Sequence, residues 1–160
     1  MKKLLYATVS SLFLLSGVKL QAQDDIKEFQ QAWGKDKKEV TRLVMGLSAA
    51  DSSKFWPIYN AYETERQKLG KDRILILDDY LTNYEALTNA KADDIIGKIF
   101  KNDQALTQLQ QQTYGKLKTA LNPMVAAKFM HVERYIQTTI QSALLEKLPV
   151  IGDLEKTKGM

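Results

Sequence analysis

Residues 48–86 read SAADSSKFWPIYNAYETERQKLGKDRILILDDYLTNYEA, and this stretch decides the fold class. Apolar and aromatic residues recur in it at intervals of three and four, which is the period of an amphipathic α-helix. The face so formed carries Phe55, Tyr59, Tyr62, Leu69, Ile76, Tyr80, Tyr84 and Leu87, with Arg66 and Arg73 inserted in the series. Pro57 lies beyond the first turn and predicts a bend. Because the stretch is longer than an ordinary globular helix, we expect one extended, bent helix.

The neighbouring segments have the same period. A helical segment precedes this one, over residues 25–45, and Gly46 is expected to end it. A third helix follows the small polar residues 88–91, and a fourth opens at Asn122-Pro123, where Asn is a good N-cap and Pro suits the first helical position. Pro149 stops the fourth helix. The sequence therefore predicts an all-α fold of four helices, arranged as elongated and bent helical hairpins.

The first 22 residues, MKKLLYATVSSLFLLSGVKLQA, have the pattern of a secretory signal peptide. Two lysines precede an apolar stretch, and Ala22 offers a small residue for cleavage. The apolar stretch is too short and too interrupted to span roughly 30 Å of hydrocarbon. We expect cleavage near Ala22, a periplasmic or secreted protein without a stable membrane anchor, a single helical domain over residues 23–151 and a polar tail over residues 152–160.

The charge and cysteine content narrow the function classes. The chain carries a formal charge of +4, but three lysines of the leader contribute to it, so the mature charge is about +1. That balance gives no support to nucleic-acid binding. The chain contains no cysteine, so neither disulfides nor a lipoprotein anchor is available. We expect stability to come from packing and from self-association, with a homodimer as the favoured form.

Two helix starts can be aligned 74 residues apart: LSAADSSKF (47–55) and LNPMVAAKF (121–129). Each has a leucine, then a capping residue, and then a Lys-Phe pair. The leucine can pack back on the first turns as a hydrophobic staple, and the phenylalanine falls on the core face. The proposed structural motif residues are Leu47, Ser48, Phe55, Leu121, Asn122 and Phe129. Helix-start chemistry alone is an equally open explanation of the repeat.

With these motifs the chain resembles the Spy/CpxP family of small periplasmic helical proteins. The family hallmark is a pair of LTxxQ motifs at helix starts, behind a signal peptide. Here the copies read LSAAD (47–51) and LNPMV (121–125), which keep the leucine and a capping residue but neither the threonine nor the glutamine. The resemblance covers roughly residues 36–144. It implies long, thin four-helix proteins that pair into curved dimers and act as ATP-independent chaperones or as stress sensors; some relatives bind metal.

No convergent set of catalytic groups can be assembled, so we predict that the chain is not an enzyme and uses no cofactor. His131 is the only histidine, which argues against a zinc site within one chain; a structural histidine and a site shared across a dimer both stay open. We place Asp93-Asp94 in the first turn of the third helix, where acids favour the helix dipole, and Asp78-Asp79 on a solvated face. We predict no metal site.

The expected contact surface lies on the second helix. Phe55, Tyr59 and Tyr62 share the core face, whereas Trp56 and Ile58 point elsewhere, so the extra apolar area needs either a partner or a wide core. Four residues are predicted to bind clients or partners: Trp56, Ile58, Arg66 and Arg73.

The leader and the helical period predict a secreted helical protein, and the resemblance to the Spy/CpxP family implies that it is a binding protein, chaperone-like or related to envelope stress, that binds unfolded clients without a cofactor. The alternatives are a regulatory protein that binds the sensor domain of a membrane signalling system, and a metal-responsive periplasmic protein.

Overall fold

A computed structural model describes residues 37–145 and residue 148. The chain divides into two compact units, residues 1–40 and 41–160. In the first unit the described residues, 37–40, are helical. The predicted signal peptide, its cleavage site, the boundary at residue 151 and the polar tail all lie outside the described residues.

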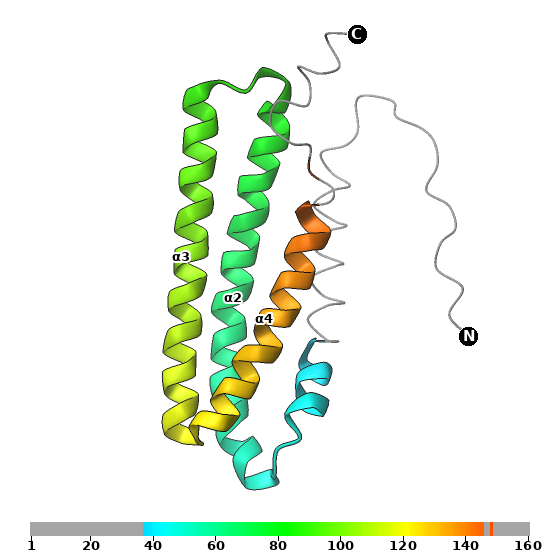
Figure 1. Ribbon diagram of the computed structural model, residues 1–160, viewed down its shortest axis with the longest axis vertical. Helices are drawn as coiled ribbons and strands as arrows, with labels where there is room; N and C mark the ends of the chain where they lie inside the picture. Colours follow the sequence, from blue (N-terminus) through cyan, green and yellow to red (C-terminus); the bar gives the residue numbers. More distant parts are fainter. Residues whose placement is uncertain (1–36, 146–147, 149–160) are drawn as a thin grey trace, which may run out of the picture. The chain divides into compact units, whose positions relative to one another are not determined.

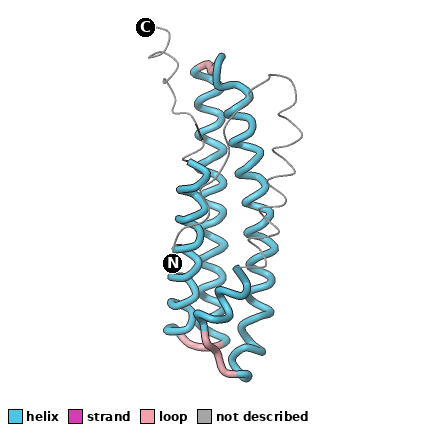
Figure 2. The backbone as a smooth tube through the Cα atoms, turned by 90° about the vertical axis from the view of Figure 1, so that its right-hand side faces the viewer, coloured by secondary structure: helices cyan, strands magenta, loops and turns pink. Residues whose placement is uncertain are grey.

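The second unit is built from helices and holds no strand among its described residues. Residues 41–45 are helical and are followed by α2 (Ala49–Asn83), a 3₁₀ turn η1 (Tyr84–Ala86), α3 (Asn89–Ala120) and α4 (Pro123–Leu145). The three long helices run alongside one another and are joined by short loops (Figures 1 and 2). The predicted all-α fold is therefore confirmed, and α2 is the single long helix that the period of residues 48–86 indicates.

Helix boundaries follow the local chemistry. Gly46 has φ of 55°, the left-handed conformation that ends a helix, and its N–H donates to the Arg42 carbonyl at 3.2 Å. The Ser48 side chain accepts from the Asp51 N–H at 3.1 Å, and the Asn122 side chain accepts from the Val125 N–H at 2.9 Å. Both predicted N-caps are confirmed. α2 continues through Pro57 and Gly70 to Asn83.

The start of α3 differs from the sequence-based prediction. Thr88 is the N-cap, because its hydroxyl accepts from the Lys91 N–H at 3.2 Å, and the helix begins at Asn89. The helix therefore starts earlier than expected, and its first turn contains no acidic residue. The placement of Asp93-Asp94 in that first turn was wrong.

The core lies where α2, α3 and α4 meet. It contains the buried residues Met45, Phe55, Tyr59, Tyr62, Leu117, Ala126 and Phe129. Tyr62 on α2 bonds Glu133 on α4, 71 residues along the chain, and α2 and α4 run in the same direction. At that offset Leu145, the last residue of α4, lies level with about residue 74 of α2. Beyond that level, α2 and α3 are the helices that the described residues form, and they continue as a hairpin (Figure 1).

Two regions of the second unit are named from here on. The closed half comprises residues 49–62 of α2, residues 109–120 of α3 and the first turns of α4, to residue 133. The hairpin half comprises residues 75–83 of α2, η1 and residues 89–102 of α3.

Candidate functional site

Four aromatic side chains of the closed half form one cluster: Phe55, Tyr59, Tyr62 and Phe129. The Phe129 ring lies edge-on to the other three, with centroid distances of 5.4 Å to Phe55, 5.9 Å to Tyr59 and 5.6 Å to Tyr62. Edge-to-face contacts of this kind add to the burial of apolar area. This aromatic cluster holds α4 against α2.

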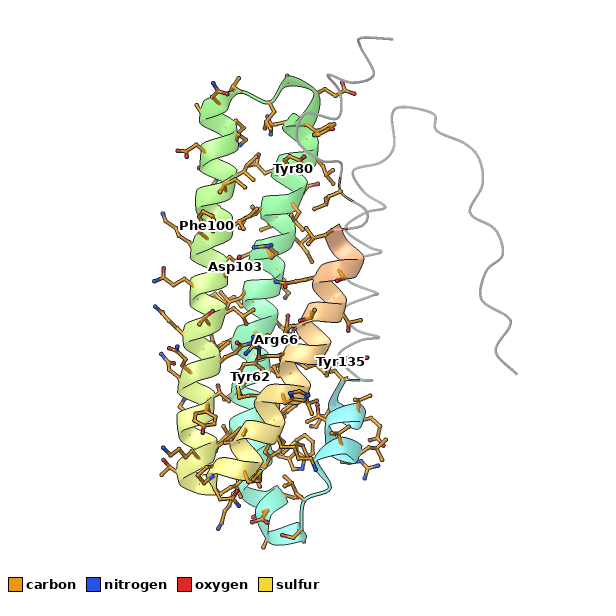
Figure 3. All side chains as sticks on the ribbon, viewed as in Figure 1. Tyr62, Arg66, Tyr80, Phe100, Asp103 and Tyr135 are labelled. Carbon is orange, nitrogen blue, oxygen red and sulfur yellow. The ribbon has the colours of Figure 1, made fainter. Side chains whose placement is uncertain are left out.

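Polar side chains are buried directly beside the aromatic cluster. The Tyr62 hydroxyl donates to Glu133 Oε1 at 2.7 Å, and Gln137 Nε2 donates to the same oxygen at 3.0 Å. On α2, Arg66 binds both carboxylate oxygens of Glu63, at 3.1 and 3.2 Å from its Nε. Figure 3 shows Tyr62 and Arg66 in the region where α2 and α4 lie side by side.

These surroundings shift the pKa of three groups. Burial raises the pKa of Tyr62 well above its ordinary value, and the negative charge of Glu133 and the hydrogen bond to it raise it further. The pKa of Tyr59 is raised by burial and then by Glu63. Burial works against the charge of Arg66, but the carboxylates of Glu63 and Glu133 and the hydroxyl of Tyr62 together outweigh it and hold the pKa of the guanidinium above its ordinary value. Both tyrosines stay neutral and Arg66 stays charged at ordinary pH.

A second arginine connects α2 to α3 near the hairpin half. Arg73 Nη1 lies 3.0 Å from Asp103 Oδ1 and 3.5 Å from the Ile99 carbonyl oxygen. The two predicted binding arginines, Arg66 and Arg73, therefore both turn toward partners within this chain. Their role in client binding stays a prediction, and any substitution there also removes an internal ion pair.

The hairpin half exposes large apolar side chains. Leu75 and Leu81 of α2 are 58% and 47% exposed, and Ile96 and Phe100 of α3 are 38% and 67% exposed. We call these four residues the hairpin surface. Ile96 and Phe100 are one turn apart on α3, so they share a face; Figure 3 labels Phe100 there. Period analysis did not single them out, because it followed the buried stripe of each helix.

An open groove of about 640 Å³ lies between α2 and α3 in the closed half. Its lining residues are Ile58, Gln112, Gly115, Lys116, Thr119 and Ala120. We call it the closed-end groove. Of the predicted contact residues, Ile58 lines this groove, whereas Trp56 is half-buried against the core, with its ring 5.1 Å from those of Phe55 and Tyr59.

The predicted motif residues take the positions expected of them. Phe55 and Phe129 are fully buried, and Leu47 and Leu121 are partly buried against the core. The two aligned helix starts thus converge on one aromatic cluster. Asp79, in contrast, is not on a freely solvated face: Lys91 Nζ lies 2.7 Å from it, and Asn83 donates to it at 3.0 Å.

The described residues also bear on metal sites and on membrane-spanning helices. Among the described residues no group of three or more His, Asp or Glu side chains could hold a metal ion, and His131 is exposed on α4. None of the described helices is both long and apolar enough to cross a membrane.

No protein-family model, no curated protein and no solved structure matches this chain. The resemblance to the Spy/CpxP family stays a prediction.

Proposed function

We propose that the chain is a secreted helical binding protein that holds exposed apolar segments of partner proteins, in the manner of a chaperone and without a cofactor. The observation that supports this best is the hairpin surface. Four large apolar side chains stand exposed on the two helices of the hairpin half. Exposed apolar residues that are scattered singly are ordinary, but Ile96 and Phe100 lie one turn apart on one face of α3, and adjoining exposed apolar side chains are typical of an interaction site.

Aggregation of reduced α-lactalbumin, followed by light scattering, tests the proposal. The variant carries Leu75→Ser and Phe100→Ser, which remove apolar contact area from exposed positions and should leave the melting temperature almost unchanged. The matched control is Met124→Ser, since Met124 is 78% exposed but lies in the first turn of α4, in the closed half. The control should protect the client as well as the parent does, and the double variant should lose most of the protection. Equal protection by all three proteins would show that the hairpin surface is not the binding site.

Self-association belongs to the same proposal. Two copies of the hairpin surface would bury apolar area that one chain leaves in water, and no disulfide compensates for that exposure. Light scattering over a dilution series should give the molar mass of a dimer, and the double variant should shift the mass toward the monomer. A parent protein that stays monomeric at high micromolar concentration contradicts this part.

A chain that protects no client would favour the regulatory alternative, in which the partner is the sensor domain of a membrane signalling system. The secreted location also needs a direct test. Mass spectrometry of the protein from the producing cell should show a first residue near Gln23. An intact Met1 would contradict the signal peptide.

A further inference from the structure

The closed-end groove differs in its chemistry from the hairpin surface. Ile58 supplies an apolar side chain from α2, while Gly115 and Ala120 contribute little bulk from α3. A Cβ added at Gly115 would meet no heavy atom within 4 Å, so this part of the groove is open space. The groove is therefore of a size and shape that admits one apolar side chain of a partner.

Uncompensated positive charge surrounds this groove. Residues 104–132, which include the whole α3 side of the groove, contain three lysines and no aspartate or glutamate. Lys116 of α3 lines the groove. On α2, Lys54 precedes Ile58 by one helical turn, so Lys54 and Ile58 lie on the same face of that helix. Both lysines are exposed, and neither forms an ion pair with a carboxylate of the described residues.

In the hairpin half, two lysines form ion pairs with carboxylates. There Lys91 and Lys98 share Asp79 and Asp94, with nitrogen–oxygen distances from 2.6 to 3.9 Å. Lys101 is exposed as well, but the hairpin half carries five carboxylates against three lysines, so it offers no comparable attraction for an anion. Residues 104–132, by contrast, carry lysines and no carboxylate.

We propose that the closed-end groove binds an acidic segment of a partner protein. An apolar side chain of the segment enters beside Ile58 and Gly115, and its flanking carboxylates face Lys54 and Lys116. Charge complementarity of this kind steers association and sets specificity. A polypeptide fits better than a nucleic acid because the groove is largely apolar and only two lysines border it, whereas phosphate backbones are held by extended basic tracks. The inference rests on the proposed binding function. It adds a second binding surface, which takes acidic segments, whereas the hairpin surface takes apolar ones.

Solubility alone is a competing explanation for exposed lysines, and Lys118 in the last turn of α3 also complements the helix dipole. A steric variant separates these explanations. Gly115→Leu fills the groove without changing any charge, and leucine is the better helix former, so the fold should be kept. Its matched control is Gly97→Leu on the same helix, where an added Cβ likewise meets nothing within 4 Å.

The probe is a fluorescein-labelled peptide with one phenylalanine between two runs of five glutamates, and fluorescence anisotropy of the full mature protein measures its affinity. We expect Gly115→Leu to weaken binding at least tenfold and Gly97→Leu to change it less than twofold. Lys116→Glu should also weaken binding about tenfold and flatten its dependence on salt, since screening acts on charge attraction. Lys101→Glu, an exposed lysine of α3 outside the groove, is the charge control and should have little effect.

Two further peptides complete the test. Replacing the glutamates with glutamine, or the phenylalanine with serine, should each reduce the affinity. Unchanged binding by Gly115→Leu, or tighter binding of an oligothymidylate of equal charge, would overturn the proposal. Client protection distinguishes this failure from failure of the proposed function: Gly115→Leu should still suppress α-lactalbumin aggregation, whereas the Leu75→Ser, Phe100→Ser variant should not.

Discussion

The closed half and the hairpin half share two helices but are stabilised by different interactions. In the closed half a third helix, α4, covers α2, and four aromatic rings and a buried carboxylate fill the interface. In the described part of the hairpin half, α2 and α3 pack along an apolar seam in which Tyr80 and Ile95 are buried, and Lys91 and Lys98 of α3 form half-exposed ion pairs with Asp79 of α2.

The difference shows what a third helix contributes. Among the described residues the hairpin half has two helices, and Leu75, Leu81 and Phe100 there are 47–67% exposed. With α4 added, the same helices bury Phe55 and Tyr62 almost completely. We therefore expect the closed half to determine the global stability of the second unit, and the hairpin half to open at lower cost and to supply binding surface.

Truncation of Phe129 should give the largest effect. Its side chain is fully buried and contacts three aromatic rings, so Phe129→Ala removes the residue that joins α4 to α2. The free energy of unfolding, measured with urea, should fall by about 3–5 kcal/mol. Tyr135→Ala on the same helix is the control, because Tyr135 is 73% exposed, and it should cost less than about 0.5 kcal/mol. Similar losses for both would contradict the role of the closed half.

Loss of the Tyr62 hydroxyl comes next. Tyr62→Phe keeps the ring but leaves the buried Glu133 with one donor fewer, which should cost about 1–3 kcal/mol in the same urea experiment. The pH dependence provides a second measurement. Since the folded pKa of Tyr62 lies above the ordinary value of 10.0, its contribution is constant below pH 10 and is lost as the pH rises further. Alkaline destabilisation should therefore begin above pH 10 and should be weaker in Tyr62→Phe.

Capping residues allow the two halves to be compared with one kind of substitution. Asn122→Ala removes the cap of α4 at the closed end, and Thr88→Ala removes the cap of α3 at the hairpin tip. Each substitution should cost about 1 kcal/mol locally. Hydrogen exchange should show the effect of Asn122→Ala in the slowest amides throughout the second unit, and that of Thr88→Ala only near the tip. A global effect of Thr88→Ala would contradict the separation into two halves.

Sequence reasoning succeeded where local chemistry decides the structure. The helical period placed Phe55, Leu117 and Phe129 in the core, and cap and staple rules located the starts of α2 and α4 at Ser48 and Asn122. The start of α3 is less distinct in the sequence, because Thr88 is a good N-cap but also opens a run of small polar residues that interrupts the helical period.

The candidate sites could not be obtained in this way. Whether Arg66 and Arg73 face a partner or a carboxylate of this chain depends on which helix lies beside them. The exposure of Phe100 depends on which face of α3 packs against α2, and the closed-end groove depends on the pairing of Ile58 with Gly115 across two helices. Each of these features depends on how the helices pack against one another, and the period of a single helix carries no information on that packing. Glu133 was missed for the same reason, since a glutamate within a helix is ordinarily exposed.

The ion-pair group at the hairpin edge should give the smallest effect. The hydrogen bond from Lys91 lowers the pKa of Asp79, and the positive charges of Lys91 and Lys98 lower it further. Because the folded pKa is lowered, the stabilisation is present above the ordinary value of 3.8 and is lost as the pH falls. Asp79→Asn should lower the melting temperature only slightly at low salt, and the difference from the parent should vanish in 1 M salt, where the screening length is about 3 Å. A difference that persists in high salt would mean that the hairpin half depends on this carboxylate for more than surface attraction, and the contrast with the closed half would then be smaller than we infer.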